Sequence, residues 1–206
     1  GAVDFAGRSV IAPNPELDMD QVALPEDNAW EIYKPFVVRQ LVRQGMPRLA
    51  AVRAAQERSA DAREALVAEM QARPVLINRA PTLHRYGIMA AWPRLTKNKV
   101  LEISPLVTKG FGADFDGDTM NYHVPTTDEA VQEAIDRMLP SRNLFSAATF
   151  DVHYKPSHEY AGGLYAASAR VDTQSKPKVF ATIADAIRAY KRGEIGAGQR
   201  VEIIEA

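Results

Sequence analysis

The chain has 206 residues, of which 46% are hydrophobic and 25% are charged, a composition typical of a soluble globular protein that excludes a disordered tail. It contains no cysteine, which excludes disulfides, cysteine-based zinc sites and thiol nucleophiles and makes the cytoplasm the expected compartment. The formal net charge of -1 argues against a nucleic-acid partner unless the charges are segregated along the chain.

The first residues contain neither an initiator Met nor a signal peptide, and no apolar run approaches the roughly 20 residues of a membrane span. We therefore expect a piece cut from a longer protein, without a membrane segment. Residues 3–12 predict a strand broken at Gly7, because a glycine between β-branched and aromatic residues often marks a bulge or a close backbone approach. The prolines at positions 13, 15 and 25 then predict irregular structure.

Two helices are expected next. The first covers about 29–44, with apolar residues at helical spacing, Asn28 as its N-cap and Gly45 at its end. The second covers 47–71 and stops before Pro74; its charges alternate in sign, so its polar side is expected to face solvent.

From 74 to 125 the chain consists of short apolar runs separated by Pro and Gly, a pattern typical of a barrel or sheet. Thr127 is the expected cap of a helix over about 128–139, which has acidic residues in its first turn. Loops follow, and the remaining expected segments are a polar linker at 172–178, a short helix at 183–193 and a last strand at 200–204. The predicted fold class is α+β, with a compact β core between helical insertions.

The charges are indeed segregated. Between Arg73 and Val100 there are six cationic side chains and no acidic one. They are Arg73, Arg79, Arg85, Arg94, Lys97 and Lys99. An acidic cluster follows, consisting of Asp114, Asp116 and Asp118. A basic tract that leads into an acidic cluster suits phosphate recognition beside a bound cation.

The acidic cluster lies in the segment GADFDGD at 112–118. Three carboxylates at alternate positions converge only if the backbone curls, and Gly117 supplies the freedom to do so. Mg²⁺ prefers such oxygen ligands, whereas without a cation the three anions would repel one another and raise their own pKa values. The nearby Phe111, Phe115 and Met120 indicate a site held against a core.

Three other interpretations of the cluster are open. The simplest is a solvated acidic turn. A calcium-binding EF-hand needs Gly at position six and Glu at position twelve, where counting from Asp114 the chain has Thr119 and Pro125. A phosphatase of the aspartyl-phosphate type has D-x-D-G-T, but Asp118 stands at the final position here. The last two are therefore disfavoured.

The segment GADFDGD closely resembles NADFDGD, the signature of the largest subunit (β′ in bacteria) of multisubunit RNA polymerases. RPVLINRAPTLHRYGI at 73–88 and VDFAGRSVI at 3–11 are also similar to that family, as are WEIYKPFV and FATIADAIRAYKRGEI, so the resemblance covers essentially the whole chain. It implies a double-psi β-barrel core with helical insertions. The implied segments are a first barrel strand and loop at 1–27, a helical insertion at 28–72, the barrel core with the metal-binding loop at 73–126, and a helix, loops and closing α/β segment at 127–206.

The resemblance also implies a DNA-directed RNA polymerase function. The three aspartates would each ligate the catalytic Mg²⁺, which activates the RNA 3′-hydroxyl while a second ion arrives with the NTP. Arg79 would lie near the ribose of the incoming nucleotide, where a guanidinium can donate to hydroxyl oxygens. Pro81 would shape that pocket, and Arg8 would contact the nucleic-acid backbone.

The implied partners are the other RNA polymerase subunits, including the second-largest, β-type subunit with the second barrel, together with the DNA template, the RNA product and NTPs. The implied location is the cytoplasm, at the nucleoid, or a host cytoplasm if the source is viral. Subunits of this family are several times longer, so the chain alone is not expected to transcribe.

Two departures from the family indicate a divergent member. The family motif begins with Asn, which helps to read the ribose hydroxyls, but this chain has Gly112 there. Residues 119–123 read TMNYH where bacterial members have QMAVH. Two other functions stay open: a non-catalytic barrel module that binds nucleic acid or a partner subunit, and a small metal-dependent nuclease or phosphatase, for which a second set of metal ligands is missing from the sequence.

Overall fold

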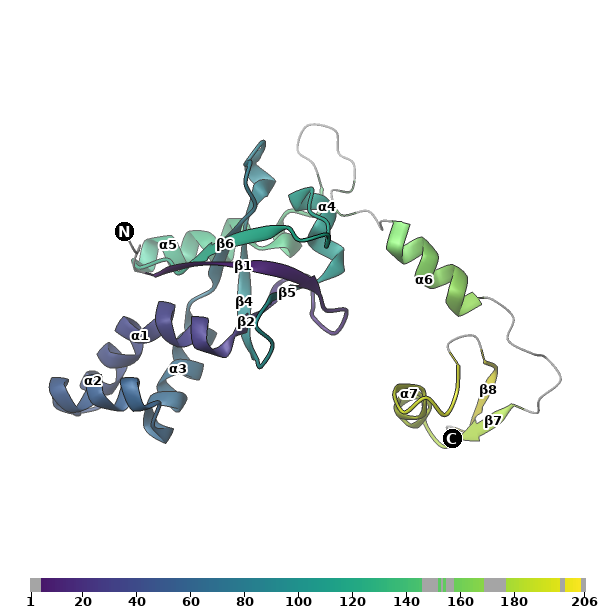
Figure 1. The fold of residues 1–206 in the computed structure, drawn as a ribbon, viewed down its shortest axis with the longest axis horizontal. Helices are drawn as coiled ribbons and strands as arrows, with labels where there is room; N and C mark the ends of the chain where they lie inside the picture. Colours follow the sequence, from purple (N-terminus) through teal and green to yellow (C-terminus); the bar gives the residue numbers. More distant parts are fainter. Residues whose placement is uncertain are drawn as a thin grey trace. The chain divides into compact units, whose positions relative to one another are not determined.

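The computed structural model describes residues 5–145, 152, 154, 158–168, 177–196 and 199–204. The chain divides into two compact units, Gly1–Lys155 and Pro156–Ala206, and Figure 1 shows the elements of each. None of the described helices is long and apolar enough to cross a membrane. The division into four segments by role stays a prediction.

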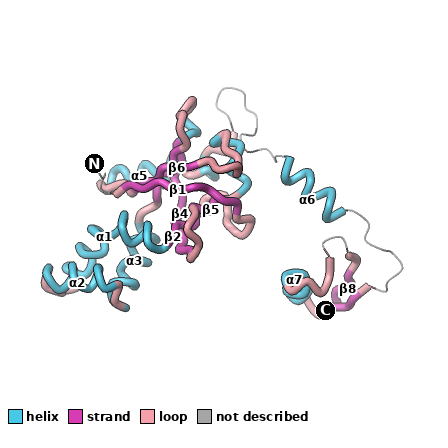
Figure 2. The backbone as a smooth tube through the Cα atoms, viewed as in Figure 1, coloured by secondary structure: helices cyan, strands magenta, loops and turns pink. Residues whose placement is uncertain are grey.

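The larger unit is built around a closed six-stranded β-barrel with the strand order β1-β5-β2-β4-β3-β6 (Figure 2). Its strands are β1 (Ala6–Pro13), β2 (Gln21–Pro25), β3 (Val75–Asn78), β4 (Ile88–Thr96), β5 (Leu101–Ile103) and β6 (Thr119–His123). The pairs β1/β5 and β2/β4 are parallel and the other pairs are antiparallel. Each of the six strands contributes buried apolar side chains to the main hydrophobic core, as a barrel of this small size requires. The predicted barrel texture of 74–125 is confirmed by four of these strands.

Strand β1 corrects one expectation. It runs through Gly7 without a break, and Gly7 pairs with Tyr122 of β6. The close approach is present all the same, since a Cβ atom at Gly7 would lie 2.5 Å from Cε2 of the Tyr122 ring. That ring is 1% exposed, and its hydroxyl accepts a hydrogen bond from the Asn28 amide and lies 3.2 Å from Ser9 Oγ.

Strand β2 was not predicted, because the prolines around it were taken as signs of irregular structure. Its five residues end at Pro25, and they pair with β4 on one edge and with β5 on the other. Four of them, from Val22 onwards, are buried. A strand buried to this extent shows no apolar-polar alternation, which explains why its pattern was missed.

Three helices, α1 (Glu26–Arg43), α2 (Arg48–Glu57) and α3 (Ala60–Ala72), pack together at one end of the barrel (Figure 1). The first confirms the expected helix, but Asn28 is not its N-cap: the helix begins after Pro25, and the Asn28 side chain bonds to the barrel instead. The single helix predicted over 47–71 is wrong. The backbone turns left-handed at Arg58, with φ 53°, and the Ser59 hydroxyl then caps α3.

Arg73, which follows α3, joins these helices to the barrel. It is 6% exposed. Its Nε donates to Glu69 at 3.2 Å, and its Nη1 donates to the carbonyls of Pro125 and Thr126 at 3.1 and 3.2 Å. The guanidinium also lies over the Phe36 ring, 4.5 Å from its centroid. This cation is therefore structural, which corrects its inclusion in a phosphate-recognising tract.

The remaining helices of the larger unit are short. Helix α4 (Thr108–Phe111) precedes the acidic cluster. Helix α5 (Asp128–Glu133) confirms the predicted helix and its cap, since the Thr127 hydroxyl accepts from Ala130 N. It continues as a π-helical turn over Ala134–Met138.

The smaller unit contains α6 (His158–Ser168), β7 (Lys178–Phe180), α7 (Ile183–Lys191) and β8 (Val201–Ile203), with β7 and β8 parallel. The helix predicted at 183–193 and the last strand are confirmed, whereas α6 and β7 were not predicted. Of the polar linker expected at 172–178, residues 172–176 lie outside the described residues.

A buried carboxylate, Glu102 on β5, forms hydrogen bonds with the end of β4 and with the segments that follow β1 and β4. It is 6% exposed and accepts hydrogen bonds from Asn14 Nδ2 at 2.6 Å, from Thr96 Oγ1 at 3.0 Å and from the Asn98 amide. Burial alone would raise the pKa of Glu102, but these hydrogen bonds together lower it below its ordinary value.

Gly7→Ala is expected to lower the free energy of unfolding of the chain by about 1–3 kcal/mol, because the added methyl group overlaps a buried ring that has no room to move. Urea denaturation measures the change. The control is a double-mutant cycle with Tyr122→Leu, which removes the overlapping ring. Additive effects of the two substitutions would contradict this account of Gly7.

Glu102→Gln tests the acid dependence of stability. Because the pKa of Glu102 is lower in the folded protein, its contribution is present above the unfolded pKa of about 4.3 and is lost as the pH falls through the folded value. The difference in unfolding free energy between the two proteins should therefore be constant near neutral pH and shrink at acidic pH. Asn98→Ala, which removes one donor, should weaken this dependence, and a difference that stays constant down to about pH 3 would refute it.

Candidate metal centre

The acidic cluster forms a tight loop between α4 and β6. Two glycines allow the turn: Gly112 is left-handed, with φ +59°, and Gly117 has φ +122°. The beginning of the loop is fixed because Ala113 N donates to the Thr108 carbonyl at 3.0 Å. Its end is fixed because the Asp118 carbonyl accepts from Ile11 N of β1 at 3.0 Å. The backbone therefore curls between two anchored points.

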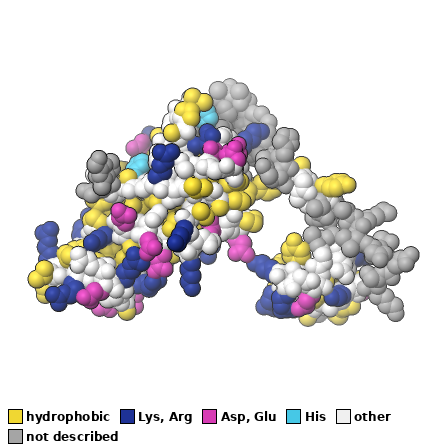
Figure 3. Space-filling view, in the orientation of Figure 1, with side chains coloured by type: hydrophobic (Ala, Val, Ile, Leu, Met, Phe, Trp, Pro, Cys, Tyr) yellow, Lys and Arg dark blue, Asp and Glu magenta, His cyan; other side chains and the backbone are white. Residues whose placement is uncertain are grey.

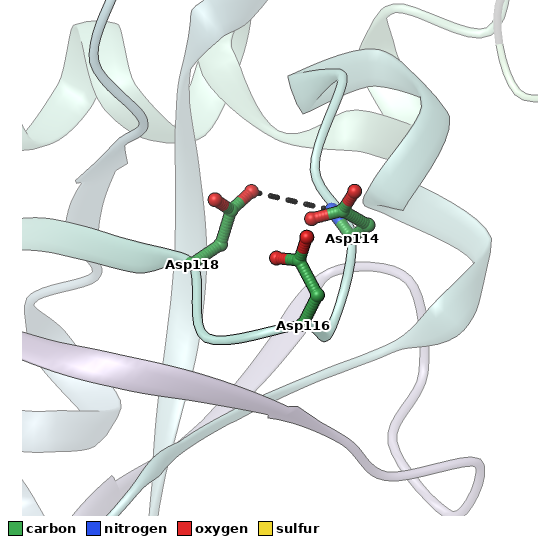
Figure 4. Close-up of side chains that lie close together, drawn as sticks. All are labelled: Asp114, Asp116 and Asp118. Atoms are coloured by element: carbon green, nitrogen blue, oxygen red, sulfur yellow. Dashed lines mark hydrogen bonds between the residues drawn. The ribbon is translucent and has the colours of Figure 1, made fainter.

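The curl brings the three aspartates together, as the spacing predicted. One carboxylate oxygen of each lies within 4.8 Å of the others (Figure 4). Asp114 and Asp116 are exposed and Asp118 is half-buried. In an octahedral Mg²⁺ shell with ligands at about 2.0–2.1 Å, oxygens are about 3–4 Å apart. The three oxygens would therefore have to move closer together to share one ion. Carboxylate oxygens are the donors that Mg²⁺, Ca²⁺ and Mn²⁺ prefer.

The charges in the loop are unevenly balanced. The neighbouring carboxylate of Asp116 raises the pKa of Asp114 above its ordinary value, and the charge of Asp118 adds to the effect. The pKa of Asp118 is lowered, because the Arg79 guanidinium donates a hydrogen bond to it. The loop thus holds repulsion between carboxylates that a cation would relieve.

Arg79 reaches the loop from the end of β3. Its Nε donates to Asp118 Oδ2 at 2.7 Å, and the backbone N of Asp114 donates to the same oxygen at 3.3 Å. The pairing of β3 with β6 places Asn78, the last residue of β3, opposite Asn121. Arg79, which follows β3, therefore lies beside the start of β6. The structure therefore places this predicted nucleotide-binding residue in contact with the predicted metal ligands.

Arg8 approaches from the opposite edge of β6. Its Nε and Nη2 donate to Thr119 Oγ1 at 2.9 and 2.8 Å, and Thr119 directly follows Asp118 in the sequence. Pro81 lies in the exposed connection between β3 and β4, after a cis peptide bond. The nucleic-acid and nucleotide roles of these two residues stay predictions.

The rest of the basic tract is not gathered at the loop. Arg85 donates to Asn143 Oδ1 at 3.2 Å and lies over the Tyr86 ring, while Arg94, Lys97 and Lys99 are exposed. On the face drawn in Figure 3, basic and acidic side chains are interspersed. The contact between Arg8 and Thr119 was not predicted from the sequence, in which Thr119 is noted only because it stands where the family motif has Gln.

The sequence of this chain matches the model of a known protein family. The sequence model of RNA polymerase Rpb1, domain 2, matches residues 1–63 and 48–139. The chain therefore belongs to this family and corresponds to a segment of an RNA polymerase largest subunit, and its fold class is the expected α+β double-psi barrel.

Similar proteins agree with this family. The DNA-directed RNA polymerase subunit beta' of Salinibacter ruber is 38% identical over 98% of this chain and 14% of that subunit. The subunit beta' of Thermus thermophilus is 38% identical over the same shares of each chain, 98% and 14%. The subunit gamma of a Cyanothece species is 41% identical over 94% of this chain and 32% of that subunit. The chain thus spans 14% of the length of these beta' relatives.

Proposed function

We propose that this chain is the part of a DNA-directed RNA polymerase that holds the catalytic Mg²⁺ during template-directed nucleotidyl transfer to the RNA 3′-hydroxyl. The observation that carries the proposal is the convergence of three carboxylate oxygens within 4.8 Å in a chain of the Rpb1 domain 2 family. The relatives of this chain are named as DNA-directed RNA polymerase subunits, which supports the same reaction.

The residues in and around the loop would have different roles. Asp114, Asp116 and Asp118 would each offer one oxygen to the ion. When bound, Mg²⁺ supplies Lewis-acid stabilisation of the reacting hydroxyl and phosphate oxygens. Arg79 would donate to the ribose hydroxyls of the nucleotide, in a pocket bounded by Pro81, because a guanidinium presents several fixed donors. Arg8 would neutralise a phosphate of the nucleic-acid backbone.

The activity proposed here is that of an assembled enzyme. The chain spans 14% of the beta' subunit of Salinibacter ruber, so the remaining parts of the largest subunit and the second-largest, β-type subunit are the proposed protein partners. DNA template, RNA product and NTPs are the proposed ligands. Such an enzyme would work in the cytoplasm, at the nucleoid.

A non-catalytic barrel that only binds nucleic acid or a partner subunit is the alternative. One observation disfavours it: three carboxylate oxygens lie within 4.8 Å of one another, and a purely structural barrel has no need to hold like charges so close together. The two functions differ in what they require of the aspartates, because binding alone does not need three converging carboxylates.

Asp116→Ala is expected to reduce template-directed RNA extension about 100-fold or more, because one ligand of the ion is lost and with it several kcal/mol of charge stabilisation. The measurement is primer extension by a polymerase reconstituted from all its subunits with the variant segment in place.

The matched control is Asp61→Ala, which removes an exposed carboxylate from α3 and should leave extension unchanged. Extension at the wild-type rate by the Asp116→Ala enzyme would refute the catalytic assignment and leave the non-catalytic barrel as the better explanation.

Gly112→Asn is expected to sharpen the choice of rNTP over dNTP by about 2–10-fold, the value of one added hydrogen bond to a ribose hydroxyl. The site can accept the side chain, since a Cβ atom at Gly112 would meet nothing within 4 Å and Asn tolerates a left-handed backbone. The ratio of incorporation rates for matched rNTP and dNTP measures the effect. Gly112→Ala imposes the same backbone cost without an amide, so equal ratios for the two variants would contradict the role of the amide.

A further inference from the structure

One carboxylate oxygen of the acidic loop already accepts two hydrogen bonds from within the protein. Asp118 Oδ2 accepts hydrogen bonds from Arg79 Nε at 2.7 Å and from the backbone N of Asp114 at 3.3 Å. A carboxylate oxygen has about two lone-pair positions, so both positions of Oδ2 are occupied. Figure 4 shows that this oxygen, which receives the dashed line from Asp114, is the one that Asp118 turns toward the other two carboxylates.

A cation that binds between the three carboxylates through this oxygen therefore competes with the two hydrogen-bond donors. The bond from Asp114 N is local to the loop backbone and is the longer of the two. The bond from Arg79 comes from a flexible side chain, of which 23% is exposed. In the described part of the chain the Arg79 side chain donates to Asp118 alone, so a single broken contact releases it.

We propose that Arg79 acts as an internal counter-ion, which pairs with the metal-facing oxygen of Asp118 and is displaced from it when a metal binds. The inference rests on the proposed function, because it assumes that the three aspartates bind a divalent cation. Its consequence is that the Nε donor of Arg79 becomes available to a substrate only when the metal is bound.

Arg79 could instead have a positioning role, and its removal would then change the metal affinity in the opposite direction. If Arg79 kept its bond and merely oriented Asp118, it would act as a positioning residue, and such residues raise metal affinity by about 10–100-fold. A displaced counter-ion lowers the affinity instead, because the metal must first break a charge-assisted hydrogen bond. The sign of the change in metal affinity on removal of Arg79 therefore separates the two roles.

The experiment compares Mn²⁺ binding by the reconstituted polymerase with the wild-type segment, with Arg79→Gln and with Arg8→Gln, in the absence of nucleotide. Mn²⁺ accepts the same carboxylate ligands as Mg²⁺, and electron paramagnetic resonance reports free Mn²⁺ directly. Arg8→Gln is the matched control, because it removes the same charge from the residue that donates to Thr119, the neighbour of Asp118.

Arg79→Gln is expected to lower the Mn²⁺ dissociation constant about tenfold or more, as the loss of a hydrogen bond between charged groups predicts. Arg8→Gln should lower it less than about fivefold, the range of an exposed charge. Equal tightening in the two variants, or weaker binding by Arg79→Gln, would overturn the counter-ion role while leaving the metal site intact. An Asp116→Ala enzyme that binds Mn²⁺ as tightly as the wild type would instead refute the metal site, and the counter-ion role with it.

Discussion

Strand β6 is hydrogen-bonded along both edges, and the arrangement of the acidic loop depends on this double pairing. On one edge Val10 of β1 lies opposite Thr119, and on the other Asn78 of β3 lies opposite Asn121. Asp118 immediately precedes this strand, so its position is set by both neighbours. The same two pairings bring one arginine from each side, from segments 111 and 39 residues away in the chain. Closure of the barrel thus creates the charge pattern around the loop.

The other end of the loop is held by packing. Phe111 at the end of α4 is 6% exposed, and Phe115 between the aspartates packs against the main core. Close packing extends into α4, where a Cβ atom at Gly110 would lie 2.7 Å from the Tyr154 ring and 2.8 Å from Met89. The side chains of Asp114 and Asp116 are therefore exposed while the backbone beneath them is fixed, which is the arrangement that precise ligand binding requires.

Local patterns carried much of the prediction. Apolar spacing identified α1, although its predicted cap was wrong, and the Thr127 cap identified α5. Three Asp residues at alternate positions, with Gly117 between the last two, identified the acidic loop. What local patterns could not supply was the pairing of distant segments. The hydrogen bond between Arg79 and Asp118 follows from the register of β3 on β6, and the burial of Arg73 follows from where α3 meets the barrel. The break at Arg58 was missed for a different reason, because a non-glycine residue rarely takes a left-handed conformation.

Two groups of carboxylates among the described residues differ in how their charges are balanced, and the contrast bears on the proposed function. Glu69 is buried beside the guanidinium of Arg73, and Glu102 is buried among three neutral donors, so each is satisfied by groups that stabilise its charge. In the acidic loop the pKa of Asp114 is raised because its main neighbour is another carboxylate. Structural carboxylates in the same fold thus obey the rule that buried charges are paired, and the loop breaks the corresponding rule for like charges. Violations of this kind concentrate at functional sites. The cation of the proposed function would balance these like charges.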